Sequence, residues 1–350
     1  MTIVFAVLLF SVLIFVHELG HFLAAKAFGV RVNEFSMFMG PAIVKWGKGE
    51  TRYSIRCIPI GGYCAMEGED EDTDDPRSFQ KAAWWKRLII LVAGSAMNFV
   101  AGFLILAIVF APAKQFSVPV IDYAEPGCTI VREGGLHVGD EFLMLDGERI
   151  YVQSDVTMFL ELNPGDTHDI VVRRNGDKLV FDNYSMEKHL FPGETAERYG
   201  ITFGKTDATF GNKLKYTWYS GLNVVRSVRL SLQMMFSGQA GFQDMTGPVG
   251  IVQIMSDTAA EAETKKDAVL DMLYIGGFIA INLAVMNLLP IPALDGGRVF
   301  GLILTVVIQK ITGKKLDPKY EGYIHGIGMI LLLALMGIIL FKDIFTIFKG

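Results

Sequence analysis

Four long runs of apolar residues set the pattern of the chain. They cover residues 3–25, 88–111, 269–289 and 323–340. Each is close to the roughly 20 residues that a helix needs to cross about 30 Å of hydrocarbon. A shorter run, residues 299–308, cannot span a bilayer and indicates a buried or interfacial helix. The pattern predicts an α-helical integral membrane protein with about four transmembrane helices.

The polar stretch between the second and third runs has the composition of strands and turns. Asn175-Gly176, between two β-branched runs, predicts a type I′ hairpin turn, and Asp146-Gly147 repeats the signal. Ser154 or Asp155 is placed to cap a short helix that ends near residue 162. We therefore expect a small β-rich globular domain with its own core.

These elements divide the chain into four expected segments. A membrane half with a β-rich loop (residues 1–111) precedes the β-rich domain (112–207), an amphipathic connector (208–265) and a second membrane half (266–350). Within the connector, residues 211–238 place apolar and basic side chains at helical spacing. Such a helix rests either at the membrane surface or on the globular domain, and the pattern does not separate the two.

The composition agrees with a membrane protein and argues against several other classes. Hydrophobic residues make up 51% of the chain, mean hydropathy is +0.37, and the net charge of −5 gives no nucleic-acid footprint. The three cysteines, Cys57, Cys64 and Cys128, lack a CxxC spacing and indicate neither a disulfide framework nor a thiolate zinc site. The first apolar run has no basic segment before it, so a cleaved signal peptide is not expected.

Basic residues near the membrane ends predict the orientation. Lys26, Lys86 and Arg87 lie between the first and second runs, and Arg298 and Lys310 follow the third. Short loops rich in such residues face the cytoplasm. The β-rich domain and both termini are then expected outside.

Five residues of the first run, His17-Glu18-Leu19-Gly20-His21, do not suit a lipid-facing helix. An acidic or basic residue at a helix centre costs about 2.5–3.5 kcal/mol on insertion, so such groups are rarely idle. His17 and His21 share one helix face and can bind one metal ion. Glu18 can reach a water molecule on that ion, which is the H-E-x-x-H arrangement of zinc hydrolases. Two histidines satisfied in a helix interface are the alternative, which the cost of polar groups in a membrane disfavours.

A catalytic zinc usually has three protein ligands, so the site needs another polar residue embedded in apolar sequence. The segment NLLPIPALDGG, residues 287–297, offers Asp295. Pro290 and Pro292 break the third span there, and broken helices are tolerated where they line a cavity or pack in protein. Both segments lie at the cytoplasmic end in the expected topology, so Asp295 can meet the histidine pair. Nitrogen and oxygen ligands of this kind suit zinc best.

HELGH in the first run and NLLPIPALDG after the third resemble the paired signatures of the site-2 protease family of intramembrane zinc metalloproteases. The inserted domain and its position resemble the bacterial regulator-of-sigma-E protease (RseP) branch. The domain is similar to a PDZ domain, through GGLHVGDEFLMLDGERI in particular. The second run carries AGSAMNF in place of the AGPxMNF of the branch, a change that removes no metal ligand. The likeness extends along nearly the whole chain and includes FMGP (residues 38–41), IPIGGYCAMEGED (58–70), DDPRSF (74–79) and TGPVGI (246–251).

The resemblance implies that His17, His21 and Asp295 bind one Zn²⁺ and that Glu18 is the catalytic acid and base, which agrees with the spacing. It further implies a single-span membrane protein as substrate, cut in or near its transmembrane segment. Such a substrate is an anti-sigma factor already trimmed by a site-1 type protease, or a remnant signal peptide. The expected location is the inner or plasma membrane of a bacterium, with the PDZ-like domain extracytoplasmic. That domain either recruits substrate tails or excludes bulky substrates, and we favour exclusion because no carboxylate-binding loop can be identified.

A helical substrate must be opened before its carbonyl groups can be attacked. Residues 51–60 alternate like a strand, and an exposed edge there would add an unwound substrate by β-augmentation at Ile55 and Cys57. The alternative is a reentrant hairpin that only covers the zinc. Asn287 either holds the substrate backbone or caps the broken helix. The acidic run at residues 67–75 is interpreted as a solvated loop rather than a second metal site.

Two other functions fit parts of the sequence. One is a non-catalytic membrane-anchored PDZ scaffold with a vestigial HELGH. The other is a transporter or channel, for which intramembrane polar residues and broken helices are also typical. A transporter of that kind needs repeated halves, and the sequence holds no second segment like HELGH or NLLPIP. Metalloprotease activity is therefore the expected function.

Overall fold

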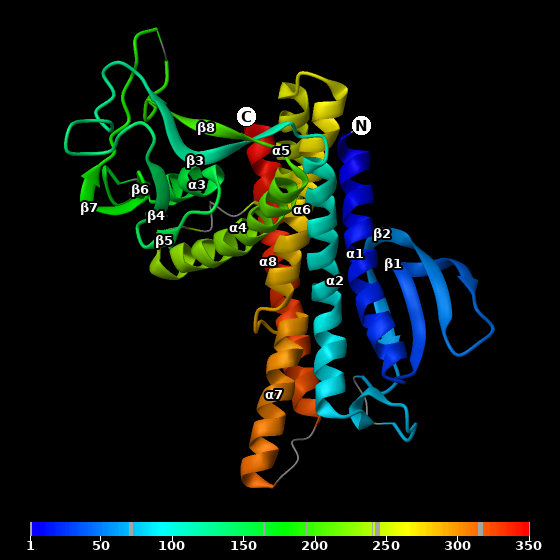
Figure 1. Cartoon of the computed structure of the whole chain (residues 1–350). Helices are drawn as coiled ribbons and strands as arrows, with labels where there is room; N and C mark the ends of the chain where they lie inside the picture. The colour runs from blue at the N-terminus through cyan, green and yellow to red at the C-terminus, as the bar shows by residue number, and fades with distance from the viewer. Residues whose placement is uncertain are drawn as a thin grey trace. The chain divides into compact units, whose positions relative to one another are not determined.

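The four apolar runs form long helices in the computed structural model (Figure 1). The structure describes residues 2–69, 73–163, 165–193, 195–239, 241, 246–313 and 318–349. Among these residues, four helices are long and apolar enough to cross a membrane, which confirms the predicted spans. They are α1 (Thr2–Ala27), α2 (Trp84–Phe110), α6 (Lys265–Asn287) and α8 (Pro318–Lys349).

The chain divides into two units. Residues 1–109 and 227–350 form the membrane unit, and residues 110–226 form the globular unit. The boundary at residue 226 falls inside α4 (Phe210–Ser237). The first part of this amphipathic helix therefore belongs with the β-rich domain.

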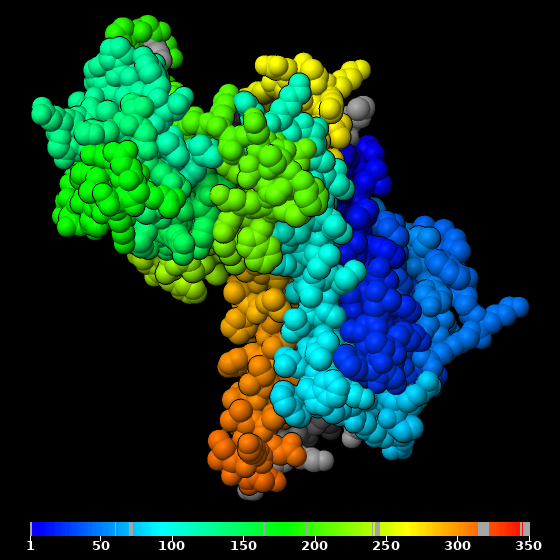
Figure 2. Space-filling view, viewed as in Figure 1, coloured from blue at the N-terminus to red at the C-terminus, as the bar shows by residue number. Residues whose placement is uncertain are grey.

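A bent β-hairpin follows α1 in the membrane unit. Its strands are β1 (Val32–Trp46) and β2 (Arg52–Met66), and Figure 2 shows the hairpin lying along one flank of α1. Both strands bend near the middle, where Gly40 and Gly61 have positive φ angles of 84° and 79°. Glycine adopts this backbone region without steric cost. The bends fold each strand into two halves that pair separately.

The pairing of these halves corrects the expected free edge at residues 51–60. The first half of β1 lies between the two halves of β2, and Ile55 pairs with Met37 on one side and with Val44 on the other. A strand segment with a partner on each side cannot accept a third strand. The outer segments of the sheet are instead residues 42–46 and 62–66.

The third predicted span ends where its prolines begin. α6 stops at Asn287, and irregular backbone at residues 288–294 leads into α7 (Asp295–Thr312). Ala293 in this segment has a φ of 79°, and its amide donates a hydrogen bond to His325 Nδ1 of α8 at 3.2 Å. Pro292 packs so closely against α8 that a Cβ at Gly328 would lie 2.3 Å from the Pro292 side chain. The last span thus supports the broken segment.

Two hydrophobic clusters hold the membrane unit together. One joins α1 to α6 and to α5 (Pro248–Glu261), and the other joins the end of α1 to the hairpin, the short helix η1 (Phe79–Lys81), α2 and α7. The first contains Ala6, Leu9, Leu13, Met255, Met272, Ile279 and Ala280, and the second contains Ala25, Val30, Val32, Phe35, Cys64, Met66, Phe79, Ile90, Leu91 and Leu302. Burial of these side chains fixes how the elements carrying polar residues approach one another.

The globular unit contains a six-stranded sheet with a short helix. The strand order is β7-β6-β4-β3-β8, and β5 pairs with β4. Both predicted turns are confirmed, since Asn175-Gly176 joins β6 to β7 and Asp146-Gly147 joins β4 to β5, all with positive φ. The elements are β3 (Gln115–Ala124), β4 (Glu141–Leu145), β5 (Glu148–Arg149), α3 (Gln153–Leu162), β6 (Thr167–Arg174), β7 (Asp177–Ser185) and β8 (Ile201–Asp207).

The predicted cap of the short helix needs a correction. The N-cap residue of α3 is Val152, which has no capping side chain of its own. Asp155, in the first turn, instead accepts hydrogen bonds from the amides of Tyr151 and Val152 at 2.6 and 3.1 Å. The Asp155 carboxylate therefore binds the two backbone amides just before α3 from within the first turn of the helix, and not from the N-cap position.

The first part of α4 rests on the globular unit, which was one of the two alternatives for this helix. Tyr216 is buried and stacks on Phe116 with ring centroids 4.1 Å apart. Its hydroxyl donates to the Ser117 carbonyl oxygen at 2.7 Å. Burial raises the pKa of Tyr216 to about 12, so the hydroxyl stays a donor at physiological pH.

Candidate metal centre

The histidine pair lies on the face of α1 that meets α2. The Nε2 atoms of His17 and His21 are 3.2 Å apart. His21 Nδ1 lies 2.8 Å from the Ile90 carbonyl oxygen on α2. Because a carbonyl only accepts, Nδ1 carries the proton and Nε2 keeps a free lone pair. The ring is thereby held with its ligand atom toward His17.

Asp295 reaches the same point from the start of α7. Its Oδ2 atom lies 3.0 Å from His17 Nε2 and 3.3 Å from His21 Nε2. The two residues after it must be glycine, because a Cβ at Gly296 would lie 2.2 Å from the Leu289 carbonyl oxygen and one at Gly297 would lie 2.4 Å from that of Ile291. The DGG sequence therefore lets the broken segment fold back tightly and present the carboxylate.

The three side chains fit a zinc ion. Ligand atoms about 2.0–2.1 Å from a tetrahedral zinc are about 3.3 Å apart, close to the observed 3.0–3.3 Å. Asp295 Oδ2 is buried and receives no hydrogen bond. A buried carboxylate oxygen and two imidazole nitrogens at these separations suit a bound cation, because each can turn a lone pair toward the same point. Among the described residues, His17, His21 and Asp295 are the one group of this kind that could hold a metal ion.

Glycines allow α1 and α2 to approach closely at the site. A Cβ at Gly20 would lie 2.3 Å from the Ala93 carbonyl oxygen, and one at Gly94 would lie 2.3 Å from His21 Nε2 and 2.9 Å from His17 Cε1. Gly94 is buried, and its α-carbon packs directly against the two imidazole rings. Only a residue without a side chain fits here, a requirement that spacing alone does not reveal.

Glu18 faces the second half of β2. A side chain at Gly62 would begin 3.3 Å from Glu18 Cγ, and the backbone of Cys64 hydrogen-bonds the carboxylate. Glu18 is partly buried and is not one of the three converging ligands. The carboxylate thus lies close enough to the three ligands to interact with them electrostatically without joining them.

The predicted substrate-binding residues lie outside this cluster. Ile55 is in the interior segment of the hairpin, and Cys57 is exposed, with its Sγ 3.3 Å from the Cβ position of Gly40. Asn287 is partly buried at the last position of α6. Their roles in substrate binding stay predictions.

The acidic run is more than a solvated loop. Glu69 pairs with Arg298 in the first turn of α7, and Asp75 pairs with Arg31 at 3.0 Å. Residues 70–72 lie outside the described part of the chain. Its described carboxylates form no metal-binding group. The Glu69–Arg298 pair instead ties the loop before α2 to the helix that carries the third ligand.

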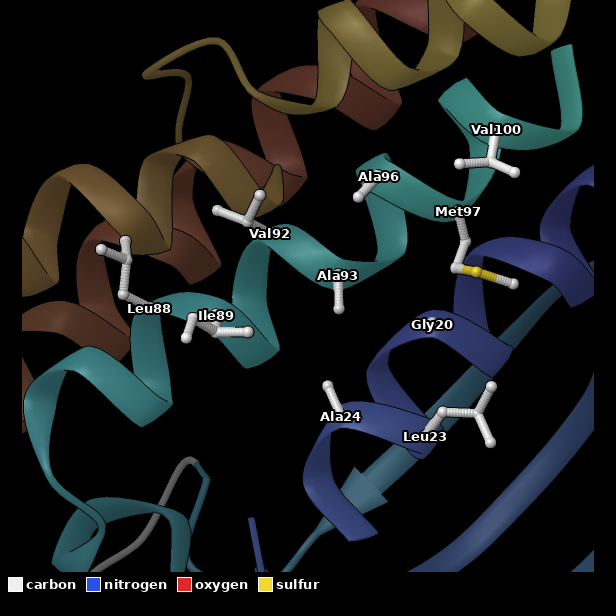
Figure 3. Close-up of a pocket in the computed structure, with 10 residues that line it drawn as sticks. All are labelled: Gly20, Leu23, Ala24, Leu88, Ile89, Val92, Ala93, Ala96, Met97 and Val100. Atoms are coloured by element: carbon white, nitrogen blue, oxygen red, sulfur yellow. The ribbon is translucent and has the colours of Figure 1, made fainter. Parts of the chain in front are cut away.

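An apolar cavity of about 540 Å³, open to the surface of the membrane unit, lies between α1 and α2. Figure 3 shows Ala93 directed toward α1, where Gly20 leaves room for it. The lining contains none of the ligand side chains and consists of Gly20, Leu23, Ala24, Leu88, Ile89, Val92, Ala93, Ala96, Met97 and Val100. The cavity adjoins the centre without contributing chemistry to it.

Two histidines and a carboxylate set among membrane-spanning helices define a metalloprotease of the site-2 protease type, and the chain belongs to peptidase family M50, whose model matches residues 5–335. A candidate zinc metalloprotease of Clostridium acetobutylicum is 34% identical over 98% of this chain and 97% of that protein. The zinc metalloprotease RasP of Shouchella clausii is 27% identical over 99% of this chain and all of its own length. The regulator of sigma-W protease RasP of Bacillus subtilis is 25% identical over 99% of each chain. The protein is a membrane-embedded metalloprotease that uses zinc.

Proposed function

We propose that the chain is an intramembrane endopeptidase that cuts single-span membrane proteins in or near their transmembrane segment. The observation that supports this most strongly is the convergence of His17, His21 and Asp295 within 3.0–3.3 Å inside helices that can span a membrane. These residues hold the zinc, and Glu18 is the catalytic base and acid.

The chemistry follows from the position of each side chain. His17, His21 and Asp295 would hold the zinc, which when bound would supply Lewis acidity to a carbonyl group and to water. Glu18 accepts the proton of the attacking water and returns it to the nitrogen of the broken peptide bond, so the carboxylate ends the cycle as it began. The apolar helices around the centre limit access of bulk water and strengthen these interactions.

The test is a paired metal and cleavage assay on the purified full-length chain in detergent. We expect one zinc per chain and chelator-sensitive cleavage of a model single-span substrate. Glu18→Gln should keep the zinc and lose at least about 100-fold in rate, whereas Glu50→Gln, an exposed carboxylate outside the centre, should change neither. Cleavage by Glu18→Gln at the normal rate would favour a scaffold or transporter instead.

The hairpin supplies an edge for an unwound substrate strand. The amides of Cys64 and Met66 face away from β1, since the first hydrogen-bonds Glu18 and the second donates to Glu69 Oε2 at 3.4 Å. By the alternation of a strand, the amide of Gly62 also faces outward. A substrate paired here lies against Glu18, with its carbonyls freed from helical hydrogen bonds. The edge next to the catalytic carboxylate is thus residues 62–66, with Ile55 and Cys57 supporting it from the hairpin and Asn287 holding the substrate from α6.

A proline scan of the hairpin tests this arrangement. Gly62→Pro removes one outward amide and should reduce cleavage at least about tenfold, because each lost ladder bond leaves a buried polar group unpaired. Ile43→Pro, on the opposite outer segment where Ile43 is exposed, should have little effect. Zinc content must be unchanged in both variants. Equal rates in the two variants would rule out strand addition at residues 62–66.

We propose that the globular unit is the expected PDZ-like domain, that it is extracytoplasmic and that it acts as a steric filter for substrates. The six-stranded sheet with its short helix supports this assignment. Deleting residues 121–203 should let untrimmed substrates be cut if the domain excludes them. A general loss of cleavage would instead identify a recruiting domain. Alkylation of a cysteine introduced at exposed Val138 in intact cells tests the topology.

The name of one relative supports a proposal for the substrate class. The Bacillus subtilis relative is named a regulator of sigma-W protease, which supports an anti-sigma factor with one membrane span as substrate here. A site-1 type protease would act on that substrate first. Accumulation of a trimmed single-span fragment in cells carrying Glu18→Gln is the expected result, and its absence would count against this class.

A further inference from the structure

Asn98 on α2 lies beside His17, on the side of the imidazole ring away from the metal centre. Its side chain is 1% exposed, and its Nδ2 atom is 3.5 Å from His17 Nδ1. The amide oxygen, Oδ1, is buried and has no hydrogen-bond partner. A buried amide with an unpaired oxygen and a long contact from its nitrogen is energetically costly.

The chemistry of His17 identifies what this amide must do. His17 Nε2 faces His21 Nε2 and Asp295 Oδ2 at 3.2 and 3.0 Å, so this nitrogen keeps its lone pair for the metal. A neutral imidazole then carries its proton on Nδ1, which must donate to an acceptor. The amide NH₂ of Asn98 is a donor and cannot fill that role.

A half-turn of the Asn98 amide exchanges its oxygen and nitrogen, which have nearly the same shape. The oxygen then stands where Nδ2 lies, and it receives the proton of His17 Nδ1. This single change replaces the donor contact to His17 Nδ1 with an acceptor contact. It also gives His17 the same kind of support that His21 receives from the Ile90 carbonyl at 2.8 Å.

We propose that Asn98 is a positioning residue whose side-chain oxygen accepts the Nδ1 proton of His17 and so fixes Nε2 as the zinc ligand. This inference rests on the proposed metal centre and adds a residue of α2 to it. Hydrogen-bond partners of metal-bound histidines orient the ring and raise its basicity. The two histidines are then held by different means, one by a main-chain carbonyl and one by an amide side chain.

Zinc affinity of the purified full-length chain, measured by chelator competition, tests the proposal. Asn98→Leu keeps the volume but has no acceptor, and its affinity should fall about 10–100-fold. Asn98→Asp keeps an acceptor and should remain within about threefold of the original protein. Ser95→Ala is the matched control, because Ser95 is also fully buried on α2 with an unpaired hydroxyl, and it should bind zinc normally.

Cobalt substitution adds a readout that a purely structural role would not move. With a carboxylate as the hydrogen-bond acceptor, His17 Nε2 donates more electron density to the metal. Asn98→Asp should therefore shift the visible absorption bands of the cobalt-substituted protein. A folded Asn98→Leu variant with normal zinc affinity would overturn the proposal, as would equal losses in Asn98→Leu and Asn98→Asp. If Asn98→Leu does not fold, an unshifted cobalt spectrum of Asn98→Asp overturns it. Normal zinc binding by His17→Ala would instead reject the metal centre itself.

Discussion

Gly94 offers the sharpest test of how the centre is built. Replacing Gly94 with alanine adds one methyl group where α2 crosses α1. That methyl would lie 2.3 Å from His21 Nε2, 2.7 Å from His21 Cε1 and 2.9 Å from His17 Cε1. The neighbouring atoms are rigid rings, one of which is anchored to the Ile90 carbonyl. The strain therefore cannot relax through a flexible side chain.

The size of the effect follows from these distances. Ordinary contact begins at 3.4 Å, so the His21 ring and α2 must separate by about 1 Å. Zinc sites tolerate ligand displacements of about 0.2 Å, roughly a fifth of the required shift. We expect Gly94→Ala to weaken zinc binding at least about 100-fold and to cost about 1–3 kcal/mol of stability through overpacking.

Gly102→Ala is the matched control on the same helix. Its methyl would lie 2.5 Å from Ile281 Cγ1 of α6, at a position farther along α2 than Gly94 and away from the histidines. It should cost similar stability and leave zinc binding unchanged. Zinc per chain by atomic absorption and thermal unfolding in detergent measure both effects. Stoichiometric, tight zinc in Gly94→Ala would refute the close crossing of α1 and α2 and the ring positions that depend on it.

Other contacts give further expected outcomes. Asp343 of α8 accepts hydrogen bonds from two backbone amides at the start of α5, at 3.0 and 3.4 Å. Asp343→Ala should lower the free energy of unfolding by about 1–2 kcal/mol. An unchanged thermal unfolding curve would show that these hydrogen bonds do not stabilise the protein. Arg298→Gln and Glu69→Gln should each weaken zinc binding about tenfold, and the double variant should lose no more than either single one. Burial alone raises the pKa of Asp146, but hydrogen bonds, first that from His168, lower it below its usual value. The stabilisation is therefore present above about pH 4 and lost as pH falls further. The denaturant midpoint should fall over the same pH range, and Asp146→Asn should make this pH dependence weaker.

Local features of the fold could be predicted from the sequence. The apolar runs predicted four membrane helices, and the dipeptides at residues 146–147 and 175–176 predicted two turns with positive φ. The spacing of His17 and His21 placed both rings on one face of α1. These features depend on residues a few positions apart, so helical period, strand alternation and turn chemistry determine them.

Other features could not be predicted, because they depend on segments distant in the chain. The sequence suggested a strand at residues 51–60 but not that β1 would cover both of its sides. It marked residues 67–75 as acidic but not that Glu69 would hold the first turn of α7. Pairing and ion contacts of this kind are selected by packing, which one-dimensional patterns do not encode.

The sequence by itself determined that two imidazoles and a carboxylate stand on one membrane helix and that Asp295 follows a broken one. Only the tertiary structure decided how these groups meet, since the approach depends on missing side chains at Gly94, Gly296 and Gly297 and on the contact of His325 with the broken segment. Whether two helices approach within a few ångströms is set by the volume of every group between them. That volume is defined once the whole chain is packed.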